Sequence, residues 1–217
     1  MTEPTRVRVL PAGDAAVLVE VAGGATADVL RLDAALRADP PDWVQDVVPA
    51  HASVLVSFDP RAVRPGQAAD WVREAGRAAA EAPAPPGGTV EIRVRYDGDD
   101  LAEVGRLTGL GAEGVVAAHT GTLWTVAFTG FAPGFGYLVP EDPDDRRLDV
   151  PRRETPRTRV PAGAVALAAG YTGVYPRPSP GGWQLLGRTG ERVWDETRDP
   201  PALLRPGARV RFVEAAG

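Results

Sequence analysis

Two residue types with important chemistry are missing from this chain of 217 residues. It contains no cysteine, and all 24 of its Lys and Arg positions are arginine. The absence of cysteine excludes thiolate nucleophiles, disulfides and Cys-based metal sites. The absence of lysine excludes a Walker A phosphate loop, a Schiff-base amine and covalent attachment of biotin or lipoate. None of these chemistries can occur on this chain.

The chain also lacks long apolar runs and an excess of positive charge. No stretch approaches the roughly 20 consecutive apolar residues of a membrane span, and the start, MTEPTRVRVL, lacks the apolar core of a signal peptide. The formal net charge of -5 is unlike the basic surface of most nucleic-acid-binding proteins. We therefore expect a soluble cytoplasmic protein that binds small molecules and other proteins, and neither nucleic acid nor membrane.

Residues 1–82 are predicted to form a small N-terminal α/β sandwich domain. Short strands are expected at 7–10, 16–21, 44–48 and 54–58. A first helix is expected to be capped by Thr26 and stopped by Pro40, and a second begins after position 66. The stretch PAPPGG at 83–88 has strong turn content and no periodicity, so it is the expected linker.

Residues 89–217 are predicted to form a β-barrel domain, which makes the whole chain α+β. Residues 89–96 alternate apolar and polar side chains, as a half-buried strand does. Two helices are expected at 100–110, where Asp100 is a plausible cap, and at 112–119. Further strands are expected at 123–128, 165–169, 174–175, 183–186, 191–194 and 208–213. Many short strands joined by tight turns favour a barrel, because a closed sheet has no exposed edge.

The stretch FTGFAPGFGYL contains a predicted turn that could form a pocket wall. Pro133 fixes φ for the first corner of a type II turn, and Gly134 accepts the positive φ of the second corner. Such a turn could hold Phe131 and Phe135 on either side of a cleft floor, with the N–H groups of Gly134 and Gly136 exposed to a ligand oxygen. The alternative is a plain turn whose aromatic side chains pack in the barrel. We favour the pocket wall.

An arginine-rich segment lies C-terminal to this turn. It contains four arginines, Arg152, Arg153, Arg157 and Arg159, and prolines at 151, 156 and 161 stiffen its backbone. Guanidinium forks suit carboxylate or phosphate, so the segment is predicted to bind an anion. The alternative is a solvated loop that the acidic residues at 141–149 neutralise. Because the spacing of these acids matches no metal motif, no metal site is predicted.

Two more candidates lie at a glycine turn and at a helix end. Gly181 and Gly182 give tight backbone geometry before a strand, in which Gln184 could hydrogen-bond an amide-like ligand. His119 is the only histidine of residues 89–217 and ends a predicted helix. It could cap free carbonyl groups there as an imidazolium. Equally, it could face a cleft as general acid, general base or anion ligand.

Several ordered segments resemble one known family. They are GFAPGFGYL (130–138), PRRETPRTRVPAGAVALAAGYTGVYP (151–176) and SPGGWQLLGRT (179–189), joined by GDAAVLVE (13–20) and VPAHASVLVSFDP (48–60). Together they resemble the family of 5-oxoprolinase B subunits, also described as allophanate hydrolase subunit 1, as the sporulation kinase inhibitor family and as carboxyltransferase subdomains C and D. The resemblance implies a small N-terminal α/β domain, a C-terminal cyclophilin-like β-barrel and a partner subunit.

The function that the resemblance implies is that of the B subunit of an ATP-dependent 5-oxoprolinase, which opens 5-oxo-L-proline to L-glutamate together with its A and C subunits. Phosphorylation of the lactam oxygen would create a good leaving group, and this chemistry needs positioned cations and donors. ATP, with Mg²⁺, is expected in a site shared with a partner subunit. The expected catalytic residue is His119. The expected substrate-binding residues are Phe131, Gly134, Phe135, Arg157, Arg159, Gly181, Gly182 and Gln184.

Two other functions are compatible with the same resemblance. One is half of a biotin-dependent carboxyltransferase, as in urea carboxylase, for which a separate protein would have to carry the biotin. The other is a non-catalytic inhibitor that docks on a histidine kinase through the barrel domain. We rank the inhibitor last, because the motif glycines and arginines suit ligand binding better than a flat apolar interface.

Overall fold

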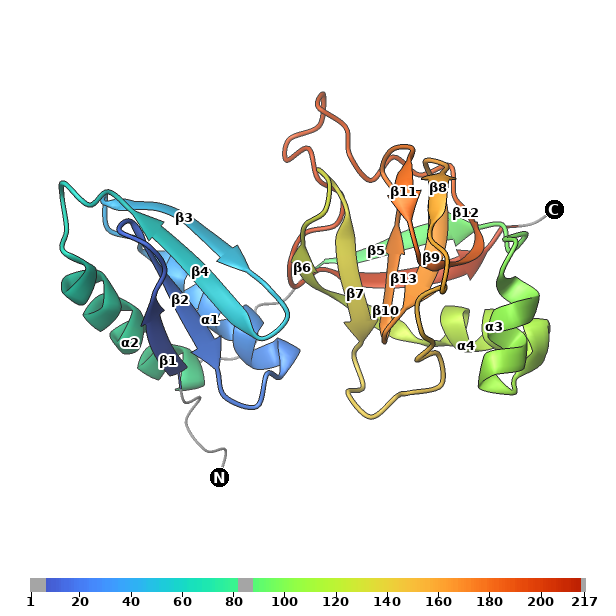
Figure 1. Ribbon diagram of the computed structural model, residues 1–217, viewed down its shortest axis with the longest axis horizontal. Helices are drawn as coiled ribbons and strands as arrows, with labels where there is room; N and C mark the ends of the chain where they lie inside the picture. The colour runs from blue at the N-terminus through green and yellow to red at the C-terminus, as the bar shows by residue number, and fades with distance from the viewer. Residues whose placement is uncertain (1–6, 82–87, 216–217) are drawn as a thin grey trace. The chain divides into compact units, whose positions relative to one another are not determined.

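The computed structural model describes residues 7–81 and 88–215. The chain divides into two compact units, Met1–Pro86 and Gly87–Gly217 (Figure 1), and each has its own hydrophobic core. The expected linker at 83–88 lies, apart from Gly88, outside the described residues. In the described ranges, every helix falls short of the length and apolar character that a bilayer crossing requires.

The N-terminal unit is a four-stranded antiparallel sheet covered on one face by two helices (Figure 1). The strand order is β1 (Val7–Pro11), β2 (Ala16–Val21), β4 (Ser53–Phe58), β3 (Val44–Pro49), and the helices are α1 (Thr26–Ala38) and α2 (Pro65–Glu81). Alternate strand residues such as Val19, Val54 and Val56 are fully buried. Leu32 and Val72 from the helices belong to the same cluster. This arrangement is the α/β sandwich that the sequence predicts.

The C-terminal unit is built around a seven-stranded sheet, together with α3 (Leu101–Thr108) and α4 (Gly111–Gly121). The strand order is β12 (Gln184–Arg188), β9 (Ala164–Ala168), β10 (Tyr171–Val174), β7 (Gly136–Pro140), β6 (Leu123–Thr129), β13 (Arg209–Glu214), β5 (Thr89–Val94). Strand β13 is parallel to β5 and antiparallel to β6. A separate ribbon pairs β8 (Arg157–Val160) with β11 (Ser179–Gly181).

The seven-stranded sheet is nearly closed, because its two outermost strands meet. Backbone hydrogen bonds of 2.8 and 2.9 Å join Arg95, directly after β5, to Arg188 at the end of β12. Glycine allows this approach, since a Cβ on Gly187 would overlap the Arg95 carbonyl. The expected α+β chain with a β-barrel in its C-terminal part is therefore confirmed.

Strand β9 is buried on both faces and separates two apolar clusters. Val165 and Leu167 belong to the barrel core, the cluster that also contains Trp124 and Phe212. The alternate residues of β9 are alanines in a second cluster, which we call the aromatic cluster. Its buried members are Phe135, Val160, Ala164, Ala166, Ala168, Tyr175, Trp183 and Leu185. The small alanine side chains leave room for the rings on this face.

The strand expected at 191–194 is wrong. Trp194 makes an isolated bridge to Ala202, and residues 191–193 belong to a loop. Conversely, 136–140 and 157–160 are strands that the pattern does not predict. Glycine opens the first, and arginines make up half of the second, so neither shows the apolar alternation of a strand.

Candidate functional site

The turn predicted at Pro133-Gly134 is a type II turn. The Phe135 N–H donates a hydrogen bond to the Ala132 carbonyl at 3.0 Å, and Gly134 has a φ of 82°. A side chain at position 134 would also collide with Trp194. Glycine is therefore required here by the backbone angle and by the close contact.

Phe131, two residues before Pro133, combines backbone strain with exposure. Its φ of 64° lies in the left-handed region, which costs a bulky residue about 1–3 kcal/mol. The residue is nevertheless 57% exposed. Its ring centroid lies 5.3 Å from that of Phe135 and 6.1 Å from that of Tyr175, both in edge-to-face geometry. An exposed aromatic residue in a strained conformation is typical of a binding site.

The rest of this turn does not form the predicted cleft. Phe135 is 2% exposed and packs against Tyr175 in the aromatic cluster. Gly134 and Gly136 are both buried, and Gly136 is part of β7. The prediction that their N–H groups face a ligand is therefore wrong, because the neighbouring strand and loop cover them. Within the turn, Phe131 is the accessible candidate.

The β8–β11 ribbon brings the predicted arginine and glycine segments together against the aromatic cluster. Arg157 in β8 pairs with Gly181 in β11. A Cβ on Gly181 would overlap the Tyr175 hydroxyl, so glycine is needed for the ribbon to approach this ring. Burial raises the pKa of Tyr175, and the nearby guanidinium groups of Arg152 and Arg157 act in the opposite direction. The segments predicted to meet near 133, 157 and 181 are therefore neighbours on the barrel.

Two of the four arginines are engaged by the buried carboxylate of Asp100, which is 3% exposed. Its Oδ1 accepts hydrogen bonds from Arg153 and, at 2.9 Å, from Arg157, while Oδ2 accepts the Leu185 N–H at 2.7 Å. Burial alone would raise the pKa of Asp100, but these hydrogen bonds hold it below its usual value. Asp100 occupies the N-cap position of α3, yet its side chain makes no capping hydrogen bond.

Arg152 and Arg159 differ from the engaged pair. Both are exposed, and neither has an ion pair among the residues that the structure describes. Their guanidinium forks are therefore free to bind an anion, and Arg152 lies near Tyr175 of the aromatic cluster. Of the two arginines predicted to bind substrate, Arg159 is accessible and Arg157 is committed to Asp100.

Gly182 and Gln184 both hold the arginine segment, and of the two Gln184 is buried while Gly182 is partly exposed. The Gly182 carbonyl accepts a hydrogen bond from the Arg153 N–H at 2.8 Å. Gln184 is 4% exposed, and its Nε2 donates to the Pro151 carbonyl at 3.3 Å. The side chain of Gln184 is covered, so the expected contact with an amide-like ligand is not available to it.

A surface groove adjoins the aromatic cluster and has a volume of about 410 Å³. It is lined by Ala162, Gly163, Tyr175, Pro176 and residues 189–194. The three motif segments meet here: Gly134 packs against Trp194, Gly163 and Tyr175 come from the second segment, and Thr189 ends the third. Small-molecule sites usually have volumes of about 300–1,000 Å³. The candidate site is the groove, together with Phe131 and Arg152, which both lie near Tyr175 in its wall.

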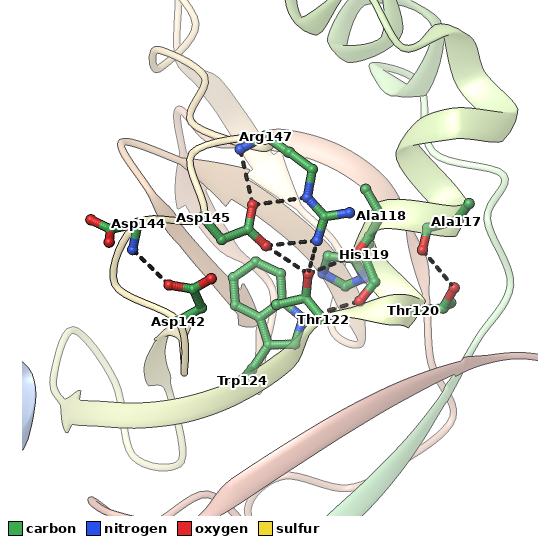
Figure 2. Close-up of polar contacts among 10 residues, drawn as sticks. All are labelled: Ala117, Ala118, His119, Thr120, Thr122, Trp124, Asp142, Asp144, Asp145 and Arg147. Carbon is green, nitrogen blue, oxygen red and sulfur yellow. Dashed lines mark hydrogen bonds and ion pairs between the residues drawn. The ribbon is translucent and has the colours of Figure 1, made fainter.

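His119 lies in the barrel core, so the prediction that it faces a cleft is wrong. It is 0% exposed, and its ring centroid lies 4.3 Å from that of Phe212. Its Nδ1 is 2.7 Å from the Tyr96 hydroxyl, and its Nε2 is 2.8 Å from the Thr172 hydroxyl. Figure 2 shows it near Trp124, whose indole N–H donates to the His119 carbonyl at 3.0 Å.

The hydrogen bonds of His119 define a neutral tautomer. The Thr172 hydroxyl donates to the Ala166 carbonyl at 3.2 Å, so it accepts a hydrogen bond from Nε2–H. Nδ1 then accepts the proton of the Tyr96 hydroxyl. Burial lowers the pKa of His119 to about 3. The ring is therefore neutral at physiological pH, and it neither caps the helix as an imidazolium nor reaches a ligand.

Among the residues that the structure describes, no ion pair joins the acidic segment at 141–149 to the arginine segment. Arg147 binds Asp145 at 2.7 Å, and Arg209 pairs with Glu141. Figure 2 shows Asp145 held by Arg147 and by Thr122, and these hydrogen bonds, chiefly that of Arg147, lower the pKa of Asp145 to about 2. Within 7–81 and 88–215, no three His, Asp or Glu side chains are grouped to hold a metal ion.

The chain matches a known family over most of its length. Residues 7–204 match the carboxyltransferase domain, subdomain C and D. A curated relative, the 5-oxoprolinase B subunit of Escherichia coli O157:H7, is 47% identical over 138 residues, which are 61% of this chain and 61% of that protein. The match thus spans less than two thirds of the relative.

Solved structures share the fold. The crystal structure of TTHA0988 has a TM-score of 0.78 at 40% identity, with 94% of this chain and 40% of that chain covered. The K. lactis urea amidolyase structure has a TM-score of 0.77 at 19% identity, with 98% of this chain and 15% of that chain covered. The second likeness concerns the fold alone.

Proposed function

Because the chain belongs to the family described as carboxyltransferase domain, subdomain C and D, we propose that it is the B subunit of an ATP-dependent 5-oxoprolinase. A relative with 47% identity is named as the B subunit of 5-oxoprolinase. Since the match covers 61% of that relative, its activity, substrate and partners are carried over here as part of the proposal.

The observation that carries the proposal is the exposed, strained Phe131 against Tyr175, a residue that also has the exposed Arg152 nearby. 5-Oxoproline is a small flat ring with one carboxylate. An aromatic face packs against such a ring, and a guanidinium fork binds its carboxylate in a bidentate manner. Phe131 is 57% exposed, and Arg152 and Arg159 are exposed as well. The same arginines suit the phosphates of ATP.

In the proposed reaction ATP would phosphorylate the lactam oxygen and leave as ADP. One water would then add to the ring carbon, and the C–N bond would break to give an acyl phosphate. A second water would hydrolyse this acyl phosphate to glutamate and phosphate. The arginines of this chain suit one task in this reaction, the stabilisation of negative charge. Arginine stabilises the charge of phosphate and carboxylate groups without transferring a proton. The described residues offer no carboxylate group arranged for Mg²⁺.

Partner subunits are part of the proposal. His119, the histidine of the barrel unit, is buried and neutral, so it does not exchange protons with a ligand. The chain has no lysine for a Walker A loop. We therefore assign the proton-transfer groups and part of the nucleotide site to the A and C subunits, with this chain completing the site.

The test is reconstitution of the chain with its partner subunits. We expect ATP hydrolysis that depends on 5-oxoproline and matches the glutamate formed. ATP hydrolysis unaffected by 5-oxoproline would refute the proposal. Biotin-dependent carboxylation by the same complex would instead favour the carboxyltransferase function, with biotin on another chain because this one has no lysine.

A further inference from the structure

One buried carboxylate makes ionic contacts to the arginine segment, residues 151–160, which the β8–β11 pairing and the contacts of Gly182 and Gln184 also hold. We propose that Asp100 is a positioning residue, which holds this segment against the barrel so that Arg152 stands near Tyr175 in the wall of the groove. The effect of Asp100 on activity rests on the proposed function, whereas its effect on the segment does not.

Asp100 connects parts of the chain that lie far apart in sequence. Its carboxylate meets Arg153, 53 residues away, Arg157, 57 residues away, and the N–H of Leu185, 85 residues away. Arg157 reaches both oxygens of this carboxylate: Nη2 donates a hydrogen bond to Oδ1 at 2.9 Å, and Nη1 makes an ion-pair contact of 2.8 Å with Oδ2 that lacks hydrogen-bond geometry. One side chain therefore ties β8 and the stretch before it to β12.

Burial makes this connection costly to lose. The side chain of Asp100 is 4% exposed, and those of Arg157 and Arg153 are 19% and 33% exposed. When one partner of a buried ion pair is removed, the remaining charge stays buried without a counter-charge. In a surface pair, water solvates the remaining charge, so the loss costs little. The backbone of the segment is held by the β8–β11 pairing and by the Arg153 N–H on the Gly182 carbonyl, while Pro151 and Pro156 have no N–H group to donate.

Asp99 provides a matched control at the neighbouring position. Its carboxylate lies 3.7 Å from Arg157, but its side chain is 79% exposed. Exposed ion pairs contribute little to stability. Asp99→Asn is therefore expected to leave the segment in place, while Asp100→Asn releases it.

Trypsin can measure the release directly, because the chain has arginine but no lysine and the segment contains four arginines, none followed by proline. In the full chain, Asp100→Asn is expected to raise cleavage within 151–160 about ten-fold, with Asp99→Asn at the wild-type rate. Mass spectrometry identifies the cut bonds. Wild-type cleavage in folded Asp100→Asn, or an increase shared equally by sites outside the segment, would overturn the proposal.

A second variant covers the case in which Asp100→Asn does not fold. Arg153→Gln removes one of the two arginine contacts and keeps Arg157 on Asp100. It should raise cleavage after Arg157 by roughly a few-fold, and an unchanged rate would count against Asp100 as the anchor.

The reconstituted complex tests the consequence for activity. Asp100→Asn is expected to raise the KM for 5-oxoproline about ten-fold with a smaller change in kcat, because positioned arginines bind the ground state as well as the transition state. An unchanged KM in a variant whose arginine segment is released would show that the position of this segment does not affect substrate binding. A wild-type complex without 5-oxoproline-dependent activity would refute the proposed function, and the trypsin result would still decide the role of Asp100.

Discussion

The two faces of β9 use polar and aromatic side chains in opposite ways. In the barrel core, the ring nitrogens of His119 are both hydrogen-bonded and the residue is 0% exposed. Across the strand, the aromatic cluster extends to Phe131, which is 57% exposed and strained. Whether a group already has its partners inside the protein, and whether water reaches it, separates a structural residue from a binding residue. Residue type alone does not.

The largest expected effect concerns stability in the barrel core. His119→Ala should lower the free energy of unfolding by about 3–5 kcal/mol, because it leaves a cavity and removes the hydrogen-bond partner of Tyr96 and Thr172. Chemical denaturation of the chain measures this. A loss below about 1 kcal/mol would contradict the structural role assigned to His119 in the barrel core.

The pH dependence of the free energy of unfolding tests the burial of His119 in the barrel core. Burial lowers the pKa of His119 to about 3 from its ordinary value of 6.5, so the unfolded chain binds the proton more readily. The contribution of neutral His119 to the free energy of unfolding is complete above the pKa that His119 has in the unfolded chain. It is lost as the pH falls toward the pKa that His119 has in the folded chain. Between about pH 7 and pH 5 the loss should be about 2 kcal/mol.

His119→Gln lacks a titrating ring and serves as the control for the pH measurement. Its free energy of unfolding should change less than that of the wild type over the same pH range. Identical slopes for the two proteins would show that other groups cause the effect.

A smaller effect is expected where the ribbon meets the aromatic cluster. Gly181→Ala should destabilise the chain by roughly 1–3 kcal/mol, because the added Cβ overlaps the Tyr175 hydroxyl. Tyr175→Phe removes that hydroxyl, so the double variant should recover part of the loss. Thermal unfolding of the two single variants and the double variant measures the coupling, and simple additivity would contradict the contact.

Local rules predicted part of this molecule well. The Pro133-Gly134 pair forms the expected type II turn, because Pro and Gly restrict the backbone whatever surrounds them. The alternation of apolar and polar residues predicted the buried face of the N-terminal sheet, because successive side chains of a strand point to opposite faces. The motif segments also meet at one place on the barrel, as expected.

The errors concern residues whose partners are distant in sequence. His119 bonds to Tyr96 and Thr172, 23 and 53 residues away, so its burial depends on how the barrel closes. Asp100 stands where a helix cap would, but its carboxylate binds two arginines that are 53 and 57 residues further on. No local pattern signals either contact. The alternating alanines of β9 are the one hint in the sequence that large rings pack on that face.

The central claim is that Phe131 serves binding and His119 serves the fold, and the KM of Phe131→Ala in the reconstituted complex tests it most directly. The matched control is Leu107→Ala, which removes a side chain that is also exposed, at 40%, from α3. We predict that Phe131→Ala raises the KM for 5-oxoproline about ten-fold while the free energy of unfolding changes by less than about 1 kcal/mol. Leu107→Ala should leave the KM unchanged. A wild-type KM in Phe131→Ala would contradict the account.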